Sequence, residues 1–321
     1  MKGKSVCMML AMVLAWSVYY TVSKILVDAT GSAYVTGFLL RLAALVFLTA
    51  QIFADGSAKQ MLKQGRSVWI LLLIGVFGFL LDLFANLGYA GGSLSTGTSL
   101  LKTDVLMVNL VTVAVYHKKL YSTDWLGTGI MLLGVLLVLG VDFSGFRLHL
   151  TDLFFLLSAA CVTANAFLIK SAEEKRGKDS DTISYYNNFV VFLLFGAFTL
   201  VRGDLRGIGE KAFSGFWPLV LLGGLAQTGI YFFYYRNLRR HEVWVVKLWL
   251  LGMPIVSSLI GVVFLHERLT LWKLVGIAVV LIGAGIILLR SKLHPEKMTG
   301  KGETHDFAES TEARKSESAP V

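Results

Sequence analysis

The chain has 321 residues, of which 55% are hydrophobic and 16% charged, and its mean hydropathy is +0.67. Soluble domains are about half apolar and about 25% charged, so this composition excludes an ordinary soluble domain. The two cysteines, Cys7 and Cys161, lie in apolar runs and exclude a disulfide framework or a zinc cluster. A net charge of +9 would suggest a nucleic-acid partner in a soluble protein, but membrane topology is the simpler explanation to test first.

Apolar runs of about 20 residues, long enough to cross a bilayer, follow one another along most of the chain. They are continuous rather than alternating, which predicts helices and not barrel strands. The first run has no small-residue cleavage site, so it is interpreted as a transmembrane helix rather than a signal peptide. The predicted spans are 5–27, 33–54, 67–88, 95–116, 123–142, 150–170, 183–202, 215–235, 243–265 and 271–290.

The second half of the sequence repeats the first. The turn that begins at His117 is followed by Gly134, and the turn that begins at His266 is followed by Gly283. Both pairs are 149 residues apart (266 − 117 and 283 − 134). Near the start of each copy the register slips, and Lys24 matches Lys170 at an offset of 146. A fixed period of this kind indicates an internal duplication.

An odd number of spans in each copy forces the second copy to enter the membrane from the opposite side. We therefore predict an all-α integral membrane protein of about ten transmembrane helices, arranged as two inverted five-helix repeats. The loop at 28–32 has no Lys or Arg, whereas its counterpart at 171–181 carries Lys175, Arg176 and Lys178. By the positive-inside rule both termini are cytoplasmic, in a multi-pass protein of the cell (inner) membrane. This orientation accounts for the basic excess, so no nucleic-acid partner is predicted.

We assign residues 1–145 to the first repeat and 146–291 to the second. Residues 292–321 are polar and charged, with hardly any aromatic side chains. A segment of this composition cannot bury a core, which predicts a disordered cytoplasmic tail.

The second copy resembles the EamA-type repeat of the drug/metabolite transporter superfamily. The resemblance is carried by Pro254 in helix nine, the turn His266-Glu267-Arg268-Leu269, and Gly276 with Gly283 in the last helix. Trp16, Lys24 and Arg41 in the first two helices also match residues common in that family. The resemblance implies a secondary transporter, with export favoured, that works by alternating access and is not an enzyme.

The first copy departs from the pattern. Lys118 stands where the family has Glu, and Val105 stands at the proline position. Helix four instead carries Lys102 and Asp104, which are not general features of the family.

Ionisable residues within the spans are the first candidates for function, because each costs about 2.5–3.5 kcal/mol to insert at the bilayer centre. Snorkelling to the interface is an equally good interpretation for Lys24 and Lys247. If transport is coupled to a proton, Asp82 is the best carrier. The candidates are Lys24, Arg41, Asp82, Lys102, Asp104 and Lys247.

Helical phase separates Lys102 from Asp104 by roughly 200°, so one cavity does not easily take both. We predict that Lys102 faces a water-filled cavity, on a stripe with Thr98, and that Asp104 forms a structural ion pair with Arg41, or alternatively with Lys24. Asp82 then remains opposite Lys102 in the cavity. The predicted substrate-binding residues are Trp16, Tyr20, Asp82, Asn86, Thr98, Lys102, Gln227, Tyr231 and Lys247.

Opposite charges in one cavity with aromatic walls suit a small zwitterion or carboxylate, with an amino acid as the leading substrate class. The alternatives are export of neutral or cationic drug-like compounds, or a membrane scaffold or sensor without transport. No metal-binding, phosphate-binding or nucleophile motif is present in the sequence, and no cofactor is predicted. The predicted partners are the lipid bilayer and a small-molecule substrate.

Overall fold

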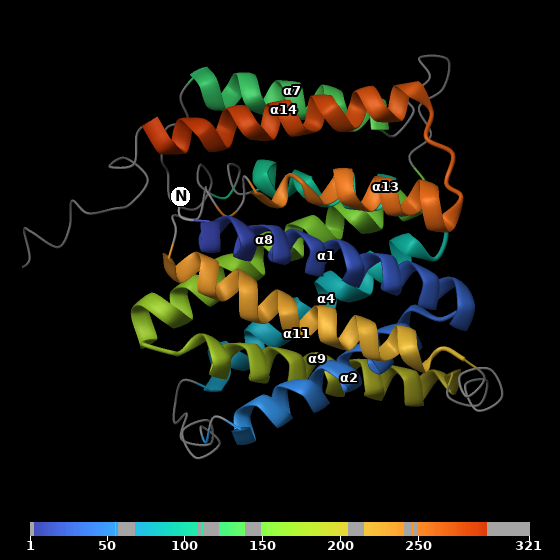
Figure 1. Ribbon diagram of the computed structural model, residues 1–321, viewed down its shortest axis with the longest axis vertical. Helices are drawn as coiled ribbons and strands as arrows, with labels where there is room; N and C mark the ends of the chain where they lie inside the picture. The colour runs from blue at the N-terminus through green and yellow to red at the C-terminus, as the bar shows by residue number, and fades with distance from the viewer. Residues whose placement is uncertain are drawn as a thin grey trace, which may run out of the picture.

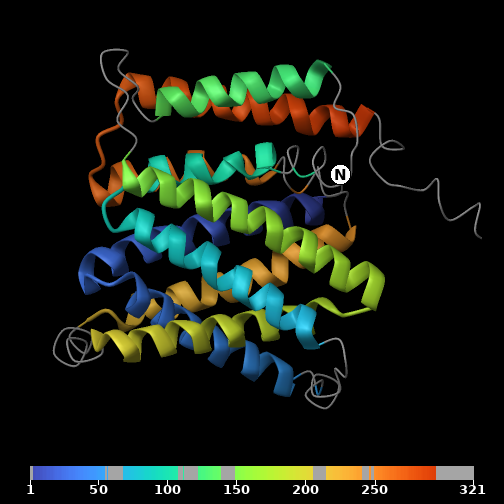
Figure 2. The ribbon, with the colours of Figure 1, turned by 180° about the vertical axis from the view of Figure 1, so that it is seen from behind.

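A computed structural model of the protein describes residues 3–54, 56, 68–107, 111, 122–138, 149–204, 215–240, 246 and 249–293. Over these residues the protein is all-helical, and its helices lie in layers with their ends at two opposite faces (Figures 1 and 2). The first copy contains α1 (Gly3–Thr30), α2 (Ala33–Ala54), α4 (Val68–Tyr89), α5 (Leu94–Leu100), the 3-10 helix η2 (Leu101–Thr103) and α7 (Ser122–Val138). The second copy contains α8 (Leu150–Arg176), α9 (Ser180–Arg202), α11 (Trp217–Arg240), α13 (Met253–Leu265) and α14 (Leu271–Leu293).

The protein is a multi-pass membrane protein. Among the described residues, five helices are long and apolar enough to cross a membrane, namely α1, α2, α4, α8 and α9. The all-helical prediction is confirmed, and α2 has the predicted bounds of 33 and 54. The predicted division at 145 and 146 lies outside the described residues, as does nearly all of the predicted tail.

Two predicted helices have a different local structure. The fourth span is interrupted, because α5 passes into the 3-10 helix η2 at Leu101 before helical structure resumes at Asp104. In the ninth span a turn at Leu251 and Gly252 precedes α13, whose first turn contains Pro254. Proline fits a first turn because it has no N–H to donate there. Pro254 therefore helps to begin this helix after a turn.

The packing of the helices follows the duplication. In the first group, α1 packs against α11 and α13; in the second group the equivalent helices α8, α4 and α5 pack in the same way. The remaining helices pair with their own counterparts, α2 with α9 and α7 with α14. These two pairs lie at opposite edges of the molecule in both views (Figures 1 and 2). Exchanging the two copies thus preserves the main contacts, as expected for inverted repeats.

Glycines mark the close helix contacts in both copies. A Cβ on Gly134 would lie 2.5 Å from the backbone nitrogen of Val280, and one on Gly283 would lie 2.6 Å from that of Met131. Neither distance is possible for a side chain, so the backbones of α7 and α14 approach one another directly. These two glycines therefore let the two helices pack closely.

A second pair of glycines fixes the register between the copies near α2 and α9. Gly75 of α4 lies against Val190 of α9, and its equivalent Gly224 of α11 lies against Ala43 of α2. Ala43 and Val190 are therefore equivalent, at an offset of 147 (190 − 43). Arg41 and Asn188 stand two residues before them and are equivalent as well.

Contacts between connections define the two ends of the helix bundle. Ser32, between α1 and α2, donates to Asp204 after α9 at 2.7 Å. At the same end, Glu267 in the turn after α13 contacts Ser95 at the start of α5. At the other end, Asn237 of α11 donates to the carbonyl of Met8, near the start of α1, at 3.3 Å. We call these the Glu267 end and the Met8 end; which of them faces the cytoplasm remains a prediction.

Candidate functional site

A buried ion pair joins α2 and α4 inside the bundle. Arg41 is 3% exposed and Asp82 is 2% exposed. Arg41 Nε and Nη2 both donate to Asp82 Oδ2, at 2.8 and 2.5 Å. Tyr19 of α1 donates its hydroxyl to the same oxygen at 2.8 Å. Three donors on one carboxylate oxygen make this a strongly bonded charged centre, as buried charges require.

The second copy supplies neutral partners for the same guanidinium. Arg41 Nη1 donates to Asn188 Oδ1 at 3.1 Å and to the Tyr231 hydroxyl at 2.8 Å. Asn188 Nδ2 in turn donates to the Arg41 carbonyl at 3.1 Å. Asn188 is the equivalent of Arg41, and Tyr231 is the equivalent of Asp82 at an offset of 149. The site therefore lies where the two copies meet, with its charges in the first copy and neutral groups in the second.

This arrangement corrects the predicted ion pairs. We predicted that Arg41 pairs with Asp104 and that Asp82 faces the cavity opposite Lys102; the ion pair of Arg41 is with Asp82. Lys24, the alternative partner for Asp104, pairs with Asp28 at 2.8 Å and donates to the Tyr89 carbonyl at 2.9 Å. The phase of a helix gives the direction of a side chain, but not which neighbouring helix lies within reach.

The other predicted residues of α1 and α4 lie near this pair. Asn86, one turn beyond Asp82, accepts from Ser23 at 2.5 Å and donates to the Ala33 carbonyl at 3.3 Å. The ring of Tyr20 lies 5.6 Å from that of Trp16 and 5.9 Å from that of Tyr89. Tyr20 is also within electrostatic reach of both Asp82 and Asp104. The predicted aromatic wall and the charged pair are therefore neighbours.

The predicted residues of helix four are buried. Thr98 donates within its own helix, to the Leu94 carbonyl at 2.9 Å. Lys102 and Asp104 are each 7% exposed, and Thr163 of α8 donates to the Asp104 carbonyl at 3.2 Å. The backbone of Asp104 thus lies beside α8. Gln227 is buried one turn before Tyr231, and Lys247 lies outside the described residues.

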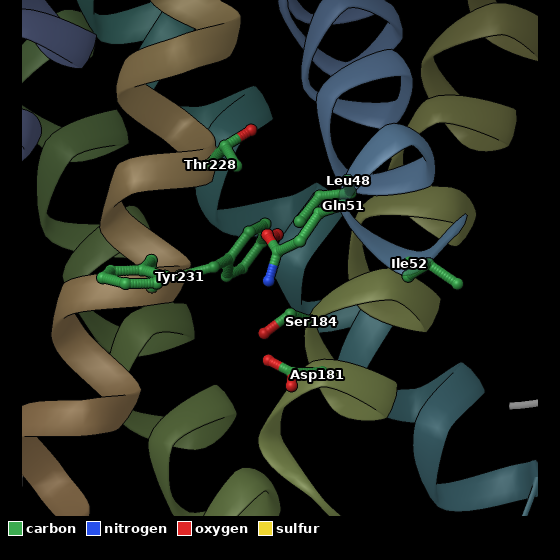
Figure 3. A pocket seen from close by; sticks show the side chains of 8 residues that line it. Leu48, Gln51, Ile52, Asp181, Ser184, Thr228 and Tyr231 are labelled. Atoms are coloured by element: carbon green, nitrogen blue, oxygen red, sulfur yellow. The ribbon is translucent and has the colours of Figure 1, made fainter. Parts of the chain in front are cut away.

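A small pocket approaches Arg41 from the Met8 end. It lies between the end of α2 and the start of α9, with α11 beside them, and its volume is about 20 Å³, room for about one water molecule. Figure 3 shows Gln51 and Tyr231 pointing toward one another near Ser184 and Asp181. Because Tyr231 also accepts from Arg41, a single side chain separates the pocket from the buried pair.

Several buried polar atoms lack a hydrogen-bond partner in the part of the chain that the structure describes. They include Trp16 Nε1, Tyr89 Oη and the hydroxyls of Ser257 and Ser258 in α13. Buried polar groups are normally bonded, so unpartnered ones in the aromatic row beside the charged pair are candidates for binding a ligand. Trp16 and Tyr89 belong to the aromatic row that contains Tyr20.

Three residues that the structure brings to the site or to the junction were not in the predicted set. Tyr19 and Asn188 contact the Arg41–Asp82 pair, and Glu267 joins one copy to the other. Tyr19 directly precedes the predicted site residue Tyr20. Asn188 could have been found as a polar residue in mid-span at the position equivalent to Arg41. Glu267 belongs to the motif turn, but nothing in its sequence position indicates that it contacts α5 of the other copy.

Comparison with known proteins agrees with the duplicated fold. The profile of the EamA-like transporter family matches twice, at residues 3–140 and 149–289. No curated protein matches the sequence. A solved crystal structure described only as that of a protein is 18% identical, with a TM-score of 0.58 over 91% of this chain and 99% of its own. At that identity the likeness concerns the fold alone.

Proposed function

The chain belongs to the EamA-like transporter family of the drug/metabolite transporter superfamily and is therefore a secondary transporter; on that premise we propose that it exports a small amino-acid-like zwitterion or carboxylate. Alternating access would move the two groups of helices about a central site. The observation that carries the substrate class is the buried Arg41–Asp82 pair at the junction of the two copies.

Arg41 is suited to bind a carboxylate. A guanidinium presents a planar fork of donors that matches two carboxylate oxygens. Its Nε and Nη2 are held by Asp82, but Nη1 donates to the neutral Asn188 and Tyr231. A substrate carboxylate would replace these neutral acceptors at a net electrostatic gain. The ammonium group of a zwitterion would then meet Asp82, so Arg41 takes the role that we first gave to Lys102.

The surroundings of the pair support an amphipathic substrate. Trp16 and Tyr20 offer aromatic faces for a side chain, and Trp16 Nε1 is a buried donor without a partner in the described structure. The pocket at Tyr231 gives one approach to the pair from the Met8 end. Its present volume is far below that of an amino acid, so binding requires the helices to move.

The alternative substrates are neutral or cationic drug-like compounds. One observation favours a cation: the carboxylate of Asp181 lines the pocket together with the rings of Tyr231 and Phe232. Against it, Asp82 is held by two nitrogens of Arg41. A cation that approaches Asp82 brings no carboxylate to compensate the displaced guanidinium, whereas a zwitterion does. A proton carried by Asp82 would meet the same obstacle. We therefore favour the zwitterion.

Transport into proteoliposomes tests the proposal. Uptake of labelled amino acids should exceed uptake of a cationic dye, with and without an imposed pH gradient. Arg41→Lys keeps the charge but not the fork, and should reduce amino-acid uptake at least tenfold. Arg176→Lys is the matched control, because Arg176 lies at the end of α8 against Trp69 and should leave uptake unchanged.

Lys102→Gln separates the two substrate classes. It removes a second buried cation and should lower amino-acid uptake without affecting a dye. Dye transport that survives Lys102→Gln and Arg41→Lys but is lost in Asp82→Asn would exclude the zwitterion. Absence of transport for every compound, in protein that remains folded, would favour a scaffold or sensor instead.

A further inference from the structure

The turn after α13 places a carboxylate of the second copy on a helix of the first. Glu267 Oε1 accepts from the backbone nitrogen of Leu94. Glu267 Oε2 accepts from the backbone nitrogen of Ser95 at 3.2 Å and from its hydroxyl at 2.7 Å. Leu94 and Ser95 are the first two residues of α5, whose N–H groups have no partner within the helix. One side chain thus binds three donors across the junction of the copies.

The local backbone is shaped to deliver this side chain. His266 ends α13 in the left-handed conformation, with φ of 52°, and is the one non-glycine residue of positive φ in the described chain. The Glu267 nitrogen then donates back to the Gly261 carbonyl at 3.0 Å. A Cβ on Gly261 would lie 2.9 Å from Glu267 Oε2, so glycine leaves room for the carboxylate. A non-glycine residue in this conformation is uncommon, which indicates that the turn has a specific role.

The contact joins the two groups of helices at one end. Glu267 follows α13 of the first group, and α5 belongs to the second. Further contacts between α1 and α4 cross between the groups toward the same end: Ser23 with Asn86, and Lys24 with the Tyr89 carbonyl. The pocket, in contrast, lies toward the opposite end. The Glu267 end is therefore tied together by these contacts, while the small pocket lies toward the Met8 end.

We propose that Glu267, bound to Leu94 and Ser95, is a latch that closes the transport path at the Glu267 end and must release α5 when that end opens. The equivalent position in the first copy is Lys118, at an offset of 149, so the opposite end cannot form the same carboxylate contact. This proposal rests on alternating access but not on the substrate class.

A cysteine behind the latch tests it without any transported substrate. Thr98 lies one turn beyond Leu94 and is fully buried, so Thr98→Cys should react slowly with a membrane-impermeant methanethiosulfonate reagent. The background carries Cys7→Ser and Cys161→Ala. The reagent is applied separately to right-side-out and inside-out vesicles, so the result does not depend on the predicted orientation.

Glu267→Ala should speed the labelling of Thr98→Cys about tenfold, from one side of the membrane only, because it removes a charged acceptor from three donors. Glu173→Ala is the matched control. Glu173 also accepts from a serine at a helix N-terminus, Ser180 at 2.9 Å, but both residues lie in the second copy. It should leave the labelling rate unchanged. Equal rates for Glu267→Ala and Glu173→Ala, in protein of normal melting temperature, would overturn the latch.

A cross-link provides a second test, which also covers a Glu267→Ala protein that fails to fold. A short reducible cross-linker between Ser95→Cys and Glu267→Cys should stop transport and keep Thr98 protected, and reduction should restore transport. Cross-linking Met8→Cys to Asn237→Cys joins two helices of one group and should allow transport. Transport that continues through the Ser95–Glu267 cross-link would disprove the latch. If no substrate is found, the labelling of a cysteine at Asn86, which is also buried, replaces uptake as the measurement. The latch can then still be tested by whether the cross-link keeps this cysteine protected.

Discussion

The contact between α7 and α14 and the site around Arg41 both bring equivalent parts of the two copies together. The equivalent residues are identical at the first and different at the second. At the first, Gly134 and Gly283 occupy equivalent positions and perform the same task, each against the backbone of the other helix. At the second, Arg41 faces its equivalent Asn188, and Asp82 and its equivalent Tyr231 both contact Arg41. The glycines of the contact between α7 and α14 have stayed the same in both copies, whereas residues at the junction have diverged.

The difference separates scaffold from function on physical grounds. A backbone contact as close as that of Gly134 and Gly283 admits only glycine in either copy, so these two positions cannot diverge. Two equivalent arginines facing one another at the junction would place like charges in a buried site, so at most one copy can carry the cation. A central charged site in an inverted repeat is therefore necessarily asymmetric. The single Glu267 latch is a second asymmetry of this kind.

Asp82→Asn should have the largest effect, because it leaves the Arg41 guanidinium buried without a charged partner. The expected loss of stability is about 3–5 kcal/mol, measured as a fall in melting temperature and in the yield of monodisperse protein. The double variant Arg41→Gln with Asp82→Asn should recover most of that stability but no amino-acid uptake. Recovery of uptake in the double variant would mean that the ion pair only stabilises the fold. The contrast between packing residues and site residues would then not hold.

Gly134→Ala and Gly283→Ala should each cost about 1–3 kcal/mol, because the new methyl group meets backbone atoms that cannot move aside. Uptake per folded molecule should stay within about twofold. Gly129→Ala and Gly285→Ala are controls in the same two helices, since nothing lies within 4 Å of either position. Equal melting temperatures for all four variants would show that the helices are not in backbone contact.

The scaffold was more predictable from the sequence than the site. The length of the apolar runs predicted the helices, and the 149-residue offset between matching residues predicted the duplication. Both can be found in the sequence without knowing which helices pack together. The interruption at Leu101 and the turn at Leu251 were missed, since each lies inside an apolar run. The partner of Arg41 was wrong for a different reason. Asp82 and Asp104 are both within the spans, and only the packing of α2 against α4 decides between them.

Asn188→Ala should cost about 1–2 kcal/mol, because it removes an acceptor from Arg41 Nη1 and a donor to the Arg41 carbonyl. The neighbouring Asn187 is a matched control, since it is buried but its Oδ1 has no hydrogen-bond partner in the described structure. Melting temperature and the concentration dependence of uptake measure the two effects. We expect Asn188→Ala to change the apparent affinity for substrate, and Asn187→Ala to change neither. If Asn187→Ala changed stability and affinity and Asn188→Ala changed neither, Asn187 rather than Asn188 would be the residue at the junction.

Lys24 gives the smallest expected effect and the sharpest test of the rule that retained residues are scaffold. It is charged and inside a predicted span, which made it a candidate for a functional role, yet its equivalent in the second copy is also a lysine, Lys170. Its contacts are the half-exposed carboxylate of Asp28 in the same helix and the carbonyl of Tyr89 at the end of α4. An exposed ion pair contributes little, and a glutamine at this position can still donate to the carbonyl. Lys24→Gln should therefore change stability by less than about 0.5 kcal/mol and leave uptake within about twofold. Complete loss of uptake in stable protein would show that a residue retained in both copies is nevertheless part of the transport site.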